Sequence, residues 1–193
     1  EVAKERGSDL GNVRFIEADA GAWRDQTFAA DLVLSRHGVM FFADPPAAFG
    51  NIREGAAPRA RLLFSCFRTP GENAWASGLA ELLGLPPSPE PRAPGPFAFA
   101  ENAHVQGILS AAGWRDIGFE AVDFAYVCGT GEDPVEDALG FFRRIGPAAP
   151  HLRSLEGEAK SKAEARIREW LERHRSGNLI AMAAASTGVG LRP

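Results

Sequence analysis

Two apolar segments separated by a helical pattern limit this chain more than any other feature. The residues DLVLSR (31–36) and RLLFSCF (61–67) are continuous apolar runs of strand length, as expected for strands covered on both faces. Between them, Asp44 precedes two prolines, and Phe49 and Ile52 follow at helical spacing, which predicts a helix with Asp44 as its N-cap. A strand, a helix and a strand at this spacing predict two parallel strands in an open α/β sheet.

The composition is that of one globular domain. The chain has 193 residues, of which 45% are hydrophobic and 24% charged, so it can bury a sizeable core. The net charge of -4 argues against a nucleic-acid surface. No stretch approaches the roughly 18 apolar residues of a membrane span, and Cys66 and Cys128 lack metal-binding spacing. We therefore expect a single cytoplasmic domain over 1–193 with reduced cysteines, no metal site, and neither nucleic acid nor membrane as a partner.

The remaining segments continue the alternation of strands and helices. Downstream, the patterns predict a helix over 101–113, a strand over 116–128, a helix capped by Asp133, a charged helix over 156–175 and a strand over 178–186. Upstream, residues 13–18 read as a strand that ends at Asp19, and the opening residues read as the end of a helix. The pattern as a whole favours the α/β class.

A proline-rich segment interrupts this pattern. Residues 85–97 hold six prolines and one glycine among thirteen residues, which excludes a helix or a central strand. The segment is either a surface loop or a lid over a ligand pocket, since long irregular insertions in compact domains are often functional. We assign it to a cap or lid insertion over about 68–104.

The order of the elements resembles the class I S-adenosylmethionine-dependent methyltransferases, in the branch of ubiquinone-type and natural-product enzymes that act on small molecules. The most similar segment is FAADLVLSRHGVMFFADPPAAFGNIREGAAPRARLLFSCFR (28–68), and PGPFAFAENAHVQGILSAAGW (94–114) is also similar. The resemblance implies a Rossmann-like sheet with flanking helices. It also implies S-adenosylmethionine as the cofactor and methyl transfer to a small organic acceptor.

Part of the family pattern does not occur in the 193 residues. The glycine-rich cofactor loop and the acidic residue that holds the ribose would both precede Glu1. The family sheet has the strand order 3-2-1-4-5-7-6, so the first two strands would separate residues 13–18 from residues 31–36. The resemblance thus implies a sheet whose N-terminal strands are absent from this chain. The strand expected over 13–18 would then need residues upstream of Glu1, or a second chain, as its partner.

The resemblance assigns the cofactor to two segments. An acidic residue at the end of the third family strand binds the adenine amine, and the next residue binds a ring nitrogen, which places Asp19 and Ala20 against adenine. From the residues alone, Asp19 could instead cap the turn that follows it. The methionine side of the cofactor is assigned to the loop after the next strand, with Ser35, Arg36, His37 and Met40 as its contacts.

His37 is the candidate catalytic residue. The branch usually has an apolar or aromatic residue at this position, whereas this chain has a side chain that can exchange a proton. A histidine there could act as a general base toward an acceptor hydroxyl, or it could be a partly buried side chain that only shapes the loop. The aromatic residues leave a similar choice between an acceptor pocket and plain core. They are Trp75, Phe97, Phe99, Phe141 and Phe142.

Two other functions remain open. The chain could keep the methyltransferase fold as a binding protein that has lost the cofactor loop. It could also be an interaction module whose unpaired strand joins a second copy, which would make a homodimer. The sequence does not distinguish methylation of oxygen, nitrogen or carbon.

Overall fold

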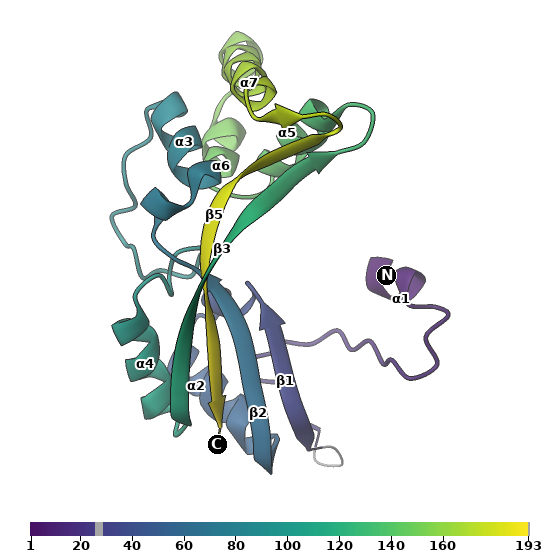
Figure 1. Cartoon of the computed structure of the whole chain (residues 1–193), viewed down its shortest axis with the longest axis vertical. Helices are drawn as coiled ribbons and strands as arrows, with labels where there is room; N and C mark the ends of the chain where they lie inside the picture. Colours follow the sequence, from purple (N-terminus) through teal and green to yellow (C-terminus); the bar gives the residue numbers. More distant parts are fainter. Residues whose placement is uncertain (26–28, 193) are drawn as a thin grey trace.

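The computed structural model describes residues 1–25 and 29–192, and it shows one strongly twisted sheet with helices packed on it (Figure 1). The strands are β1 (Ala30–Arg36), β2 (Ala56–Phe67), β3 (Arg115–Thr130), β4 (Arg175–Ser176) and β5 (Leu179–Arg192). The helices are α1 (Val2–Arg6), α2 (Pro45–Glu54), α3 (Ala74–Leu83), α4 (Asn102–Ala111), α5 (Pro134–Phe142), α6 (Ala148–Ser154) and α7 (Gly157–Glu172). Two short 3₁₀ helices are η1 (Val39–Phe41) and η2 (Pro70–Glu72).

The strand order confirms the expected α/β class. The main path of the sheet is β1-β2-β5-β3, and β4 pairs with β5. β1 and β2 are parallel, whereas β5 runs antiparallel to β2 and to β3. This order equals the 4-5-7-6 part of the methyltransferase sheet, so the Rossmann-like expectation without the N-terminal strands is correct.

The connection between β1 and β2 forms for the reasons that the sequence indicates. The Oδ1 atom of Asp44 accepts a hydrogen bond of 3.0 Å from the backbone N–H of Ala47, and so caps the first turn of α2. Prolines occupy the first turn, where the missing N–H costs nothing. Phe49 is fully buried beneath the sheet. The predicted strand–helix–strand unit is therefore present.

The prediction of a strand over residues 13–18 is wrong. These residues form no strand and all are exposed, and Figure 1 shows this part of the chain leading away from the sheet to α1. A strand needs a neighbour to pair its backbone N–H and C=O groups. Residues 13–18 pair with neither edge strand of the described sheet, β1 or β3, so the segment belongs to no strand ladder.

The helices form two groups on the sheet. α2 and α4 pack on one face of its lower half, and α3, α5, α6 and α7 gather around the upper part of β3 and β5, beyond the end of β2 (Figure 1). The buried side chains form one hydrophobic cluster that joins both groups. In the described part of the chain, no helix is both long and apolar enough to span a bilayer.

The second face of the lower sheet is open. Leu32 and Leu34 on β1 are 50% and 66% exposed, although the continuous apolar run predicts burial on both faces. A hollow of about 640 Å³ lies over this face, and its floor includes the glycines Gly118, Gly188 and Gly190. We call this region the open sheet face.

The proposed cap insertion combines a helix with an irregular segment. Its first half holds α3, which packs on β5 and α7, and this helix is missing from the sequence-based prediction. The proline-rich second half has no helix or strand, as predicted. The N–H of Gly95 donates to the carbonyl oxygen of Met40 over 3.1 Å, and Arg92 pairs with Glu101. The proline-rich segment is thus attached to η1.

Candidate functional site

The loop after β1 lies at the carboxyl end of two parallel strands, which is the edge where open α/β sheets bind ligands. The backbone N–H of His37 donates to the carbonyl oxygen of Ser65 over 3.0 Å, which extends the pairing of β1 with β2 by one residue. His37 then turns the chain with a φ of 53°, a conformation that is uncommon for residues other than glycine. The loop therefore leaves the sheet sharply at His37.

Three contacts hold the His37 ring. Its Nε2 atom lies 2.9 Å from the hydroxyl oxygen of Ser186 on β5. The ring stacks on Phe67 with a centroid distance of 4.0 Å and an interplanar angle of 8°, and a second stacked ring, Phe124, lies 6.3 Å away. Within the described residues, Nδ1 has no hydrogen-bond partner. The Nε2 atom is therefore hydrogen-bonded to the protein. Because the His37 side chain is only half-buried, Nδ1 can bond to water or to a ligand.

Burial lowers the pKa of His37 below its ordinary value of 6.5, and the neighbouring charge of Arg36 lowers it further. The ring is therefore neutral at pH 7 and carries one proton, either on Nδ1 or on Nε2. A neutral imidazole can accept a proton at one nitrogen and donate one from the other. Both roles are chemically available at this position.

Aromatic side chains surround the histidine. Phe67 contacts the rings of Trp75 and Tyr126 at centroid distances of 5.1 and 5.8 Å, and Tyr126 also lies 6.1 Å from Phe124 and 5.9 Å from Phe141. Phe124, Tyr126 and Phe141 are half-buried, so their rings are partly accessible. We call the group formed by His37, Phe124, Tyr126 and Phe141 the aromatic surface.

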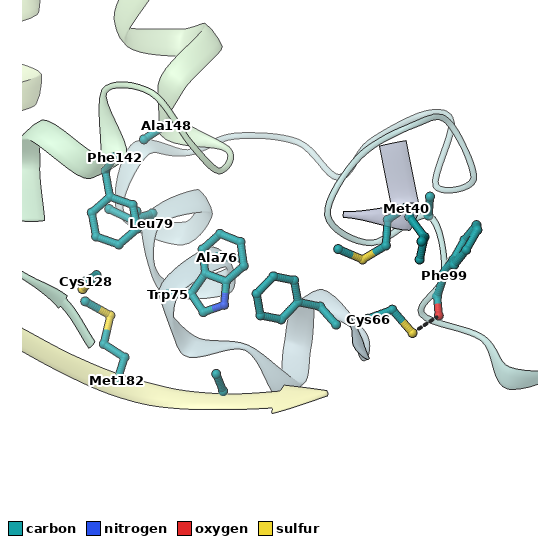
Figure 2. Packing of buried hydrophobic residues seen from close by; sticks show 14 of the residues in the cluster. Met40, Cys66, Trp75, Ala76, Leu79, Phe99, Cys128, Phe142, Ala148 and Met182 are labelled. Carbon is teal, nitrogen blue, oxygen red and sulfur yellow. Dashed lines mark hydrogen bonds between the residues drawn. The ribbon is translucent and has the colours of Figure 1, made fainter. Parts of the chain in front are cut away.

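The five aromatic residues selected from the sequence divide between core and surface. Trp75, Phe99 and Phe142 are at most 1% exposed and belong to the core, and Figure 2 shows them among its packed side chains. Phe97 and Phe141 are half-buried. Only the latter two could contribute to a pocket wall without rearrangement of the core.

The other predicted contacts of the methionine side lie in different environments. Ser35 is half-buried and Arg36 is exposed, and both line the hollow on the open sheet face. Arg36 makes no ion pair within residues 1–25 and 29–192. The side chain of Met40 is 1% exposed and packs in the core, where Figure 2 shows it with Cys66 and Phe99. The structure thus brings Ser35, Arg36 and His37 to one edge and turns Met40 inward.

Asp19 forms a local turn. Its Oδ1 atom accepts a hydrogen bond of 2.8 Å from the N–H of Gly21, and its carbonyl oxygen accepts from the N–H groups of Ala22 and Trp23. Asp19 and Ala20 are both exposed. The turn-capping role is therefore present, and a carboxylate retains further lone pairs for another donor.

The segment after Asp19 is tied to α2. The amide of Asn51 donates to the carbonyl oxygen of Trp23 over 3.0 Å, and its Oδ1 atom accepts from Arg24. A Cβ atom at Gly21 would lie 3.1 Å from Cβ of Ala48. These contacts hold the segment that follows Asp19 and Ala20 against α2. Helix α2 and the loop after β1 both belong to the connection between β1 and β2.

Three residues near His37 were missed by reasoning from the sequence. Ser186 lies in an alanine-rich strand, and Phe124 and Tyr126 lie in a strand whose alternation indicates only which residues share a face. Nothing in the sequence shows that β5 and β3 pass beside the loop after β1. Among residues 1–25 and 29–192, no three His, Cys, Asp or Glu side chains are arranged to hold a metal ion.

Sequence comparison identifies no relative: no protein-family model matches the chain, and no characterised protein matches it by sequence. Similarity to solved structures is clear. A candidate methyltransferase from Bacillus halodurans has a TM-score of 0.50 and 12% identity, over 99% of this chain and 77% of that protein. The YcgJ protein of Bacillus subtilis has a TM-score of 0.52 and 14% identity, over 99% and 76%. Phosphoethanolamine N-methyltransferase 2 of Haemonchus contortus, in complex with S-adenosyl-L-methionine, has a TM-score of 0.47 and 13% identity, over 100% and 40%.

The two Bacillus structures match nearly the whole of this chain in fold, at identities too low to transfer an activity. The sheet order and the parallel β1–α2–β2 unit also agree with the fold that the resemblance implies. The chain therefore has the fold of the class I S-adenosylmethionine-dependent methyltransferases.

Proposed function

We propose that this protein transfers a methyl group from S-adenosylmethionine to a small organic acceptor. The observation that carries the proposal is the position of the Ser35–His37 loop at the carboxyl edge of β1 and β2 in a methyltransferase sheet. Ligands of open α/β sheets bind at this edge. The net charge of -4 supports a small acceptor rather than a nucleic acid, and the free cysteines Cys66 and Cys128 support a cytoplasmic location.

The described residues fit the cofactor on its adenine side. Asp19 is exposed and its Oδ2 atom takes no part in the turn, so it can accept a hydrogen bond from the adenine amine. Ala20 is exposed and small, which leaves its backbone N–H accessible to a flat ring. We propose Asp19 and Ala20 as the adenine contacts.

On the methionine side, Ser35, Arg36 and His37 are the proposed contacts. Met40 can contribute only through its backbone or after a change of its buried side chain, because that side chain is 1% exposed. S-adenosylmethionine supplies an electrophilic methyl group on a sulfonium sulfur. The protein therefore has to align the acceptor with that methyl group, and proximity provides much of the rate.

His37 is the proposed catalytic residue. His37 belongs to the aromatic surface, where an apolar acceptor could stack on Phe124, Tyr126 or Phe141, and its Nδ1 atom makes no hydrogen bond within the described residues. An acceptor held there would meet Nδ1 with its polar group. The neutral ring could then orient that group or exchange a proton with it.

Calorimetric titration with S-adenosylhomocysteine tests the proposal. The titration uses the 193-residue chain and the longest form of the protein that its gene encodes. Asp19→Ala should weaken binding by about 10- to 100-fold, because a hydrogen bond to a charged group contributes about 1.5–3 kcal/mol. Asp31→Ala is the matched control, since Asp31 is an equally exposed carboxylate at the start of β1.

Absence of binding by both forms would overturn the proposal and leave a binding or dimerisation protein with a methyltransferase fold. Equal binding by Asp19→Ala and Asp31→Ala would overturn the adenine contact alone.

A further inference from the structure

Ser186 is a buried hydroxyl group in the middle of β5. Its residue is 3% exposed, and few polar residues of the described chain are buried to this extent. Its Oγ atom lies 2.9 Å from Nε2 of His37, and this is its one hydrogen bond within the described residues. The pair joins the last long strand of the sheet to the loop after β1.

The burial of Ser186 determines which way this hydrogen bond runs. A hydroxyl group has one proton to donate, and a buried donor without an acceptor is costly. If Nε2 donates to Oγ, the Ser186 proton has no acceptor within residues 1–25 and 29–192. If Ser186 donates to Nε2, its proton is used and Nε2 provides the lone pair.

The second arrangement leaves the ring proton on Nδ1. This nitrogen has no protein partner in the described chain, and the ring is half-buried, so water or a ligand can accept from it. The stacked rings of Phe67 and Phe124 and the neighbouring guanidinium of Arg36 offer no acceptor that would compete for this proton.

We propose that Ser186 is a positioning residue that donates a hydrogen bond to Nε2 of neutral His37, so that His37 presents an Nδ1–H donor toward the methyl acceptor. A nitrogen that already carries a proton cannot remove another one. His37 would then orient an oxygen or nitrogen lone pair of the acceptor and would not act as its general base. The use of the donor rests on the proposed function, but the protonation of the free protein does not.

The ring nitrogens of His37 report directly on this proposal. In a ¹⁵N-labelled sample of the full chain at pH 7.5, long-range nitrogen–proton correlation spectra distinguish a protonated ring nitrogen from one with a lone pair. The chain has four histidines, and His37→Gln identifies the signals of His37. We expect a protonated Nδ1 and an unprotonated Nε2. A protonated Nε2 in the wild-type protein would overturn the proposal.

Substitution of Ser186 tests the cause. Ser186→Ala should shift the tautomer ratio of His37 toward Nε2–H by about 2- to 10-fold, the effect of one neutral hydrogen bond. Ser186→Thr keeps the hydroxyl and should keep the Nδ1–H form. Thr187→Val is the matched control, because Thr187 is also 3% exposed and is not bonded to His37.

An unchanged ratio in Ser186→Ala would also overturn the proposal. If Ser186→Ala does not fold, Ser186→Cys makes the same comparison, since a thiol is a weak donor. These spectra need no cofactor. A failure to bind S-adenosylhomocysteine would overturn the proposed function and leave the tautomer result standing.

Discussion

Asn73 connects three segments of the chain and is fully buried. Its Oδ1 atom accepts hydrogen bonds from the backbone N–H of Ala185 on β5, over 3.0 Å, and from Nε1 of Trp75, over 3.3 Å. Its Nδ2 atom donates to the carbonyl oxygens of Arg68, Thr69 and Ala185. The side chain therefore continues the pairing of β5 at the point where β2 ends, and it fixes the start of α3.

Replacing Asn73 with alanine should destabilise the fold severely. The change removes the acceptor of two donors, the N–H of Ala185 and Nε1 of Trp75, and both residues are at most 3% exposed. A buried donor without a partner costs about 1–3 kcal/mol, so the two together should cost about 2–6 kcal/mol. The carbonyl groups lose less, because a second interaction remains available to Ala185, whose oxygen also accepts from the N–H of Arg68.

Urea denaturation followed by circular dichroism measures this loss. The free energy of unfolding should fall by about 2–6 kcal/mol with an unchanged dependence on urea concentration. Asn102→Ala is the matched control, because Asn102 is exposed in the first turn of α4, and its effect should stay within about 0.5 kcal/mol. A loss below about 1 kcal/mol for Asn73→Ala would refute the assignment of Asn73 as a buried connector.

Two further changes test the contacts of α5. A Cβ atom at Gly129 would overlap the backbone carbonyl oxygen of Pro134, so Gly129→Ala should destabilise the fold by about 1–3 kcal/mol or more in the same urea assay. Gly140→Ala, with no atom within 4 Å of the new Cβ, should be neutral or stabilising by up to about 1 kcal/mol, and an equal loss in both variants would contradict the packing. The hydrogen bond from Arg143 lowers the pKa of Glu164 below its ordinary value of 4.5. This contribution is present above pH 4.5 and is lost as the pH falls through the lower folded-state pKa. Stability measured from pH 7 to pH 3 should therefore decline less in Glu164→Gln than in the wild type, and parallel curves would exclude the contribution.

The strand and helix pattern could be predicted where local signals agree. Asp44 and Asp133 precede prolines and apolar residues at helical spacing, and each caps its helix as expected. α3 was not predicted, because the prediction for the insertion over about 68–104 rested on its proline-rich segment, and residues 74–83 received no prediction of their own. The helix begins after Asn73 and ends at Gly84, whose φ is 65°, and its packing against β5 and α7 stabilises it.

Residues 13–18 show the limit of a strand pattern. Alternating apolar residues indicate that a segment can pair, but pairing requires a neighbouring edge with free backbone groups. That requirement is a property of the whole sheet. The edge strands of the described sheet are β1 and β3, and the upstream segment pairs with neither of them and remains exposed.

Some features of the candidate site could be predicted before the structure was known, and others could not. The resemblance to the methyltransferase family, and no local pattern alone, selected Asp19, Ser35, Arg36 and His37, because it relates each of them to a cofactor-binding segment of that family. The inward position of Met40 could not be recognised, because a methionine in a short loop suits either core or ligand. Its burial follows from the 3₁₀ turn of η1 and the attachment of Gly95.

The sequence by itself determined the α/β class, the parallel β1–α2–β2 unit and the loop that follows β1, because these depend on residues close together in the chain. Only the tertiary structure decided what surrounds His37. Ser186 is 149 positions away in sequence, and it reaches the ring because β5 inserts between β2 and β3. Strand order depends on backbone pairing between distant segments, and no local pattern contains that information.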